Sequence, residues 1–205
     1  MDADAARQFW NSRYDRPDYL FGEAPNAFLA SQSGRLTPGL TALVVADGEG
    51  RNGVWLAERG LTVTTTDIAP RAVEKALALA ARRGVSLEAR VTDLDQWDWP
   101  EATFDVVVAI FIQFAAPYAR DRLFARMKAA LKPGGLILLQ GYRPQQIAYG
   151  TGGPPQVENL YTESLLRDAF ADFDIVHLGS HDSDISEGAG HAGRSALIDL
   201  VARRP

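Results

Sequence analysis

Three glycines in the first half of the chain have a spacing that is typical of nucleotide-binding loops. Gly48, Gly50 and Gly53 follow an apolar run and precede a helical pattern, and Asp67 comes 19 residues after Gly48. Glycines let the backbone turn sharply and approach a ligand, and a carboxylate at the end of the next strand can accept hydrogen bonds from both ribose hydroxyls. The pattern therefore predicts a nucleoside-binding loop, and a tight turn without a ligand is the alternative.

The charges within this loop distinguish between two kinds of nucleoside cofactor. Asp47 and Glu49 bring two carboxylates next to the glycines, and Arg51 brings one cation. Carboxylates at close range repel a pyrophosphate, which binds best to a charge-free loop and helix amides. S-adenosylmethionine has no phosphate and carries a sulfonium and an ammonium group, so negative surroundings favour it. Arg51 can pair with Glu49 or with a ligand carboxylate, and Asp93 is placed to accept from an adenine amino group.

Short apolar runs alternate with helical patterns along the chain. The runs predict strands over residues 41–46, 61–66, 86–91, 104–111, 136–140, 173–178 and 196–202. The helical patterns cover residues 52–59, 70–83, 117–131 and 162–170, and a polar loop is expected over 179–194. This alternation predicts an α/β sheet with helices on both faces, parallel early strands and an antiparallel last pair at one edge.

In such sheets, ligands bind beyond the carboxyl ends of the strands, at the point where the strand order reverses. The segments expected around one crevice at that edge are Ala46–Gly53, Asp67, Asp93, Ile110–Phe114 and Gln140–Tyr142. Each of them taken singly is also compatible with a plain turn.

Length and composition narrow the class of protein further. The 205 residues, 46% of them hydrophobic, predict one globular domain over 1–205. A net charge of −5 disfavours nucleic acid and anionic lipid surfaces as partners. The sequence has no cysteine, which excludes thiolate nucleophiles and cysteine-ligated zinc. No apolar run reaches the roughly 20 residues of a membrane span, so we expect a soluble, cytoplasmic protein.

The sequence resembles the class I S-adenosylmethionine-dependent methyltransferases, and among them the group similar to tellurite-resistance and thiopurine methyltransferases. The resemblance runs nearly end to end. Its most specific motifs are the loop GEGRN (48–52) and the turn KPGG (132–135), together with FWNSRYDRPDYLFGEAPNAFL (9–29) and EGAGHAGRSA (187–196). It implies a Rossmann-like, doubly wound and mostly parallel seven-stranded sheet. It also implies an N-terminal helical lid segment over 1–35 and an α/β core over 36–205.

The same resemblance implies roles for residues around the cofactor. Gly48 and Gly50 would approach its methionine part, Asp67 its ribose, and Asp93 with Leu94 its adenine. The complete set that we expect at the cofactor is Ala46, Asp47, Gly48, Glu49, Gly50, Arg51, Asn52, Asp67, Ile68, Asp93, Leu94 and Ile110. Ala46 departs from the family pattern, which has an acidic residue there, and the neighbouring Asp47 can substitute for it.

Residues expected at the methyl acceptor come from several segments. By resemblance, Trp10, Tyr14 and Phe21 look like a lid over cofactor and acceptor. Gln113, Tyr142 and His191 follow predicted strands or lie in the polar loop, where they can face the acceptor. No catalytic base is evident, and the spacing of the histidines and acids in this loop fits no metal site.

The function expected from the sequence is transfer of a methyl group from S-adenosylmethionine to a small acceptor, such as a thiol or a chalcogen oxyanion, by direct displacement. Two alternatives remain: a nicotinamide-dependent oxidoreductase, which the loop motif also fits, and a non-catalytic S-adenosylmethionine-binding protein. The sequence predicts neither the acceptor's identity nor the oligomeric state.

Overall fold

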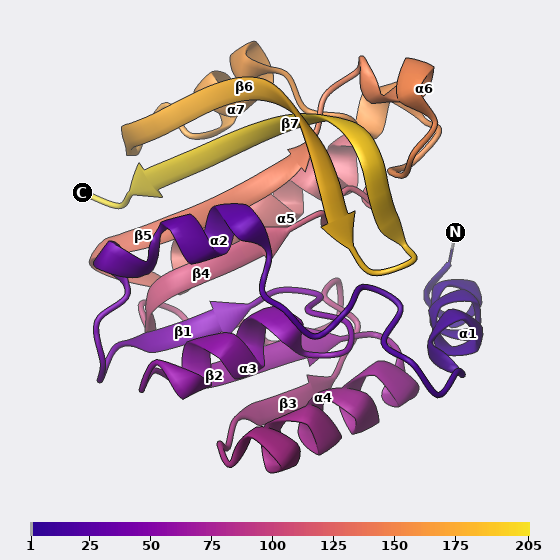
Figure 1. Ribbon diagram of the computed structural model, residues 1–205. Helices are drawn as coiled ribbons and strands as arrows, with labels where there is room; N and C mark the ends of the chain where they lie inside the picture. The colour runs from indigo at the N-terminus through magenta and orange to yellow at the C-terminus, as the bar shows by residue number, and fades with distance from the viewer. Residues whose placement is uncertain (1) are drawn as a thin grey trace. The chain divides into compact units, whose positions relative to one another are not determined.

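The computed structural model describes residues 2–205 and divides them into two compact units (Figure 1). The first unit comprises the residues up to Asp98 together with Glu187–Gly190, and the second comprises Trp99–Ser186 and His191–Pro205. The seven strands have the order β3-β2-β1-β4-β5-β7-β6 in one sheet. The predicted α/β sheet, mostly parallel with an antiparallel ending, is confirmed.

The first unit contains three parallel strands and the helices that connect them. Strands β1 (Thr41–Val44), β2 (Thr62–Asp67) and β3 (Glu88–Val91) alternate with helices α3 (Arg51–Glu58) and α4 (Pro70–Arg83). Before them come α1 (Ala3–Tyr14), α2 (Ala27–Ser31) and the short 3₁₀-helix η1 (Ser33–Arg35). Helix α4 begins at a proline with no amide to satisfy and ends before Gly84, whose φ of 69° suits a glycine cap.

The second unit holds the other four strands. Strand β4 (Phe104–Ile110) pairs in parallel with β5 (Leu131–Tyr142), and β5 pairs antiparallel with β7 (His191–Arg203). The remaining elements are α5 (Pro117–Ala130), α6 (Gln146–Tyr149), η2 (Val157–Asn159), α7 (Glu163–Ala169) and β6 (Asp174–Glu187). Within residues 2–205, no helix combines the length and the apolar character needed to cross a membrane.

The polar loop predicted over 179–194 is wrong, because these residues extend β6 and β7 into a long hairpin. The apolar alternation that marks a strand is absent there. Its place is taken by polar contacts: Asp182 accepts from Arg143 and Tyr149, and His181 Nε2 lies 3.0 Å from Asp199 Oδ2. Of these contacts, the one between His181 and Asp199 joins neighbouring strands, and such pairs stabilise a sheet. Arg143 directly follows β5 and Tyr149 lies in α6. Hydrophobic periodicity detects neither kind of contact.

Close packing behind the glycine loop leads to a first prediction. Gly50 has a φ of 88°, and a Cβ at this position would lie 2.6 Å from the Cβ of Ala76 in α4. Gly84 has a similar φ of 69° and open space around it. We expect Gly84→Ala to cost about 1 kcal/mol from backbone strain alone and Gly50→Ala to cost a further 1–3 kcal/mol, roughly, from overpacking. Chemical denaturation of both variants measures this, and equal losses would contradict the packing argument.

Candidate functional site

The glycine loop is a tightly bent segment that is fastened to the end of β2. Ala46, Gly48 and Gly50 all have positive φ angles, of 50°, 62° and 88°. The Gly48 amide donates to Asp67 Oδ2 at 2.9 Å, and the Ala69 amide donates to Asp67 Oδ1 at 2.9 Å. One carboxylate therefore fixes both the loop and the turn that follows β2. Each carboxylate oxygen can accept a second hydrogen bond, so Asp67 keeps acceptor capacity for a ligand.

Asp47 is a buried carboxylate, and within residues 2–205 only one of its two oxygens accepts hydrogen bonds. Its Oδ2 accepts from the Gly53 amide at 2.9 Å and from Thr65 Oγ1 at 3.2 Å. Its Oδ1 is also buried and has no hydrogen-bond partner within residues 2–205. Burial raises the pKa of Asp47 to about 7 and the pKa of Asp67 to about 6. A buried acceptor without a partner is costly, and an ammonium donor from a ligand would satisfy it.

Two other charged residues of the loop point into the protein instead. Glu49 forms an ion pair with Lys75 of α4 and accepts from the Leu20 amide at 2.7 Å. Arg51 pairs with Glu187 at 2.7 Å. Of the two partners that the sequence left open for Arg51, Glu49 is therefore not the one it contacts. The sequence-based picture of two free carboxylates facing a ligand is corrected accordingly, since of Asp47 and Glu49 only Asp47 keeps an oxygen in reserve.

Asn52 and Glu187 hold the N-terminal segment. The Oδ1 atom of Asn52 accepts from the Asn26 amide at 2.9 Å, and Glu187 Oε1 accepts from Asn26 Nδ2 at 2.9 Å and from the Ala27 amide at 3.3 Å. Arg51 and Asn52 thus contact protein residues beside the loop, Glu187 and Asn26 respectively. Neither role is evident from sequence, because Glu187 lies 136 residues after Arg51.

The aromatic residues expected as a lid lie together in the first unit. Tyr14 is buried, and its hydroxyl would lie 2.8 Å from a Cβ at Gly48. Trp10 stacks on Tyr14 with ring centroids 5.7 Å apart, and Phe21 meets it edge-on at 6.3 Å. Burial, followed by the carboxylates of Asp67 and Glu49, raises the pKa of Tyr14 well above its usual value. The phenol therefore stays protonated and covers the glycine loop.

Residues expected at the adenine follow β2 and β3. Ile68 and Leu94 are half-buried. The Asp93 carboxylate accepts from the Asp95 amide at 2.9 Å and so caps its own turn. The Thr92 amide donates to the Asp67 carbonyl at 2.8 Å, which ties the ends of these two strands together.

In the second unit, the ends of β4 and β5 carry an aromatic cluster. Phe111 directly follows Ile110, stacks on Tyr142 with centroids 4.6 Å apart, and meets His191 edge-on at 4.4 Å. Its φ of 54° is rare for a bulky residue, and such strain clusters at functional sites. Phe111 lies in the segment Ile110–Phe114 that was expected at the crevice, but it was assigned no role there, because hydrophobicity alone makes it the last residue of the strand.

Gln113 does not have the acceptor-facing role predicted for it. Its side chain is buried, its Nε2 donates to the carbonyls of Tyr142 and Asn159, and its Oε1 accepts from the Tyr142 amide. All of these bonds brace the backbone at the end of β5. The correction follows from the direction of the side chain, which the sequence does not reveal.

Comparison with known proteins indicates the protein family that this chain resembles. Residues 42–135 match the family model of a methyltransferase domain. The resemblance to class I methyltransferases is confirmed. The chain is 34% identical over 100 residues to a ubiquinone biosynthesis O-methyltransferase of Paramagnetospirillum magneticum, and 32% identical over 103 residues to an uncharacterised protein of Mycobacterium tuberculosis. Each match covers 49% of this chain but only 39% and 36% of the relative.

Solved structures share the fold over nearly the whole chain, one of them a methyltransferase. Magnesium protoporphyrin IX methyltransferase of Synechocystis, with bound S-adenosylhomocysteine, has a TM-score of 0.75 at 17% identity and covers 100% of both chains. TehB of Haemophilus influenzae has a TM-score of 0.73 at 14% identity, over 98% of this chain and 67% of that one. A protein that converts a disulfide bond into a thioacetal group in echinomycin biosynthesis has a TM-score of 0.77 at 20% identity, over 97% and 92%. These identities show a common fold.

The raised pKa values of the loop carboxylates predict how stability depends on pH. An unfolded aspartate titrates near pH 4, whereas Asp47 and Asp67 in the folded chain hold their protons up to about 7 and 6. Their contribution to stability is thus fully present below pH 4 and is lost as the pH rises through 7. We expect the melting temperature of Asp47→Asn to fall less than that of the wild type between pH 5 and pH 8. Asp98→Asn, at an exposed position, is the control and should keep the wild-type slope.

Proposed function

We propose that this chain binds S-adenosylmethionine at residues 46–53 and transfers its methyl group to a small-molecule acceptor. The observation that carries the proposal is the buried Asp47 Oδ1 atom without a partner in residues 2–205, next to a glycine loop in a matched methyltransferase domain. An ammonium group next to that oxygen would satisfy it, and a pyrophosphate would be repelled by it. The chain's residues therefore fit the methionine end of the cofactor.

The remaining contacts to the cofactor follow from the same loop. We assign its ribose to the free acceptor capacity of Asp67, and its adenine to Ile68, Asp93 and Leu94. Ala46, Gly48 and Gly50 supply a backbone without bulky side chains, while Glu49, Arg51 and Asn52 hold the loop in its bent shape. Ile110, at the end of β4, stays a proposed cofactor contact of the second unit.

The cofactor, when bound, supplies a methyl group that is already activated on a sulfonium. The task of the protein is then to align the acceptor and to exclude water. Trp10, Tyr14 and Phe21 form an apolar cover over the loop for this purpose. Because Tyr14 stays protonated, it can donate a hydrogen bond but cannot remove a proton from the acceptor. A thiolate or another anion, which needs no base, fits this site better than a neutral alcohol.

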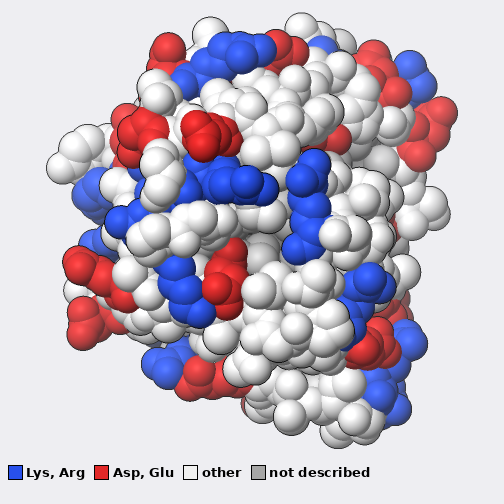
Figure 2. All heavy atoms as spheres, turned by 90° about the vertical axis from the view of Figure 1, so that its left-hand side faces the viewer, with Lys and Arg blue, Asp and Glu red and all other residues white. Residues whose placement is uncertain are grey.

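For the acceptor we propose a soft nucleophile such as a thiol or a chalcogen oxyanion. Two proteins of the same fold support this class: TehB, and the echinomycin protein that acts on a disulfide. The O-methyltransferase relative makes a phenolic hydroxyl the comparison compound. Phe111 and His191, which pack on the buried Tyr142, are the aromatic surface that we propose for the acceptor in the second unit. Acidic and basic side chains are interspersed over one face of the molecule (Figure 2), which favours a small acceptor over a nucleic acid.

Calorimetric titration with S-adenosylhomocysteine and, in parallel, with NADH tests the cofactor. We expect micromolar binding of the first and none of the second. Asp67→Ala should weaken binding by about 1–3 kcal/mol, because hydrogen bonds to a charged acceptor are lost, while Asp98→Ala, at an exposed position, should leave it unchanged. Wild-type affinity in a folded Asp67→Ala protein would sink the ribose assignment, and binding of NADH alone would sink the proposed function.

The acceptor class is tested by following S-adenosylhomocysteine formation with a small thiol, tellurite and a phenol as substrates. Turnover of the thiol or of tellurite, rising with pH as the acceptor loses its proton, is the expected result. Turnover of the phenol alone would overturn the proposed acceptor class but would leave the methyltransferase assignment standing.

A further inference from the structure

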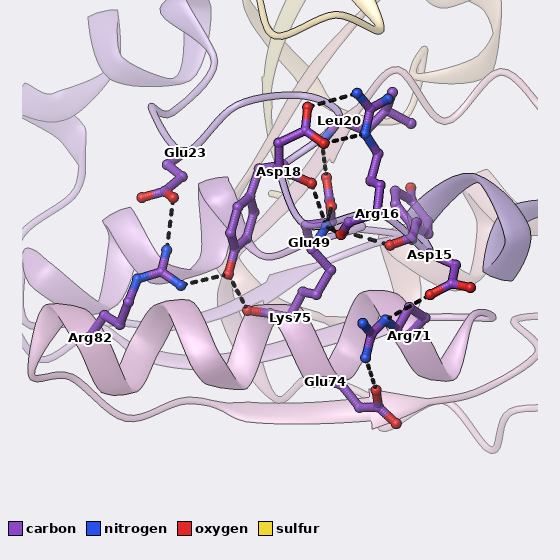
Figure 3. Close-up of polar contacts among 12 residues, drawn as sticks. Asp15, Arg16, Asp18, Leu20, Glu23, Glu49, Arg71, Glu74, Lys75 and Arg82 are labelled. Carbon is purple, nitrogen blue, oxygen red and sulfur yellow. Dashed lines mark hydrogen bonds and ion pairs between the residues drawn. The ribbon is translucent and has the colours of Figure 1, made fainter.

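A buried lysine on α4 gathers the N-terminal segment onto the glycine loop (Figure 3). The ammonium group of Lys75 donates to the carbonyl of Asp18 at 2.6 Å and to that of Arg16 at 3.1 Å, with the carbonyl of Tyr14 at 3.5 Å. It also forms the ion pair with Glu49. Residues 14–18 thus wrap around a single cation, in the way that a chain wraps around a bound metal ion.

Glu49 completes the connection from the loop's side. One of its oxygens pairs with Lys75, and the other accepts from the Leu20 amide at 2.7 Å. The ring of Tyr19 lies against the ammonium at 4.8 Å, and its hydroxyl donates to the Lys75 carbonyl at 3.0 Å. Residues 14–20 are therefore held from both sides, by α4 and by the loop that we assign to the cofactor.

The Gly190 amide also donates to the Leu20 carbonyl at 2.9 Å, and Arg82 donates to the Tyr19 hydroxyl at 3.1 Å. The other ion pairs of the N-terminal segment are weak by comparison. Arg71 and Asp15 approach to 3.7 Å, and Arg82 and Glu23 to 2.8 Å, with side chains that are 39–76% exposed. Exposed pairs of this kind contribute little. The Lys75 and Glu49 side chains are 10% and 2% exposed, where the loss of one partner leaves an uncompensated buried charge.

The segment held in this way lies directly on the loop. The Tyr14 hydroxyl occupies the space in front of Gly48, and Tyr14 and Leu20 pack with Ala69 and Ala72 at the start of α4. A ligand that contacts Gly48 from the side of Tyr14 therefore reaches or leaves it only when residues 14–20 move. Movement requires the three carbonyls to leave Lys75 and the Leu20 amide to leave Glu49.

We propose that Lys75 is a positioning residue that holds residues 14–20 closed over the glycine loop and thereby sets how fast the cofactor product is released. This inference rests on the proposed function for the identity of the ligand. The claim that one buried cation holds residues 14–20 in place depends only on contacts within this chain, whatever the ligand is.

The test compares Lys75→Met with the double variant Glu49→Gln, Lys75→Met. The single variant removes the cation and strands the Glu49 charge, so it loses both stability and closure. The double variant removes both charges, and its stability should return toward that of the wild type, while the new side-chain amide at position 49 still accepts from the Leu20 amide. The carbonyls of residues 14–18 stay without their donor in both variants. Arg83→Met is the matched control, since it removes an exposed cation of α4 whose partners, Glu23 and Glu58, lie outside residues 14–20.

Two measurements are made on each protein. Hydrogen exchange of the peptide that covers residues 14–20, without any ligand, should be faster by about tenfold or more in both Lys75 variants, given the strength of charged hydrogen bonds, and unchanged in Arg83→Met. Stopped-flow release of S-adenosylhomocysteine should accelerate by a similar factor, with KM for S-adenosylmethionine rising more than kcat falls. A double variant with wild-type exchange and release would overturn the proposal, because Lys75 would then only balance the charge of Glu49.

The two proposals fail in different ways. Absence of S-adenosylhomocysteine binding to the wild type would overturn the proposed function, while the exchange measurement would still decide whether Lys75 closes the segment. Binding with unchanged release rates in the double variant would overturn the role of Lys75 and leave the proposed function intact.

Discussion

Buried charge around the glycine loop is the constraint on which the first unit depends. Asp47, Glu49 and Asp67 are buried, and the Glu187 side chain is only 10% exposed. A charge removed from water has to be paired, hydrogen-bonded or neutralised by a proton. Glu49 forms an ion pair with Lys75, and Glu187 forms one with Arg51. Asp67 accepts hydrogen bonds from two backbone amides. Asp47 has a raised pKa and one oxygen that accepts no hydrogen bond within residues 2–205. The unused oxygen is the feature on which our proposal of a binding site at the loop rests.

These pairings explain why distant segments meet at the loop. The segment before α2 is bound through Asn26 to Asn52 and Glu187, and residues 14–20 are bound through Lys75 and Glu49. The polar and charged side chains of the loop thus bind the N-terminal segments that cover it. A charge-free glycine loop, as a pyrophosphate prefers, would have no such means of attaching a cover.

Sequence reasoning recovered what depends on local pattern. The glycine spacing, Asp67 at the end of β2 and the helix limits at Pro70 and Gly84 all follow from local backbone rules, and the structure has them at the expected positions. Sequence reasoning failed where a polar side chain binds a partner that is distant in the sequence, as with Arg51 and Glu187 or with the amide of Gln113. The hairpin of β6 and β7 was lost for the same reason, since hydrophobicity does not record polar contacts between strands.

The tip of that hairpin has a consequence for how the chain is made. Glu187–Gly190 belongs to the first unit, although 88 residues of the second unit, Trp99–Ser186, precede it in the sequence. During synthesis, Arg51 therefore waits for a partner that leaves the ribosome 136 residues later, and Asn26 waits for the same partner. The first unit cannot complete its polar interior until then, so its final folding step is a contact of high sequence separation and correspondingly slow. A chain truncated after Asp98 would lack Glu187, and Arg51 would then have lost the carboxylate with which it pairs.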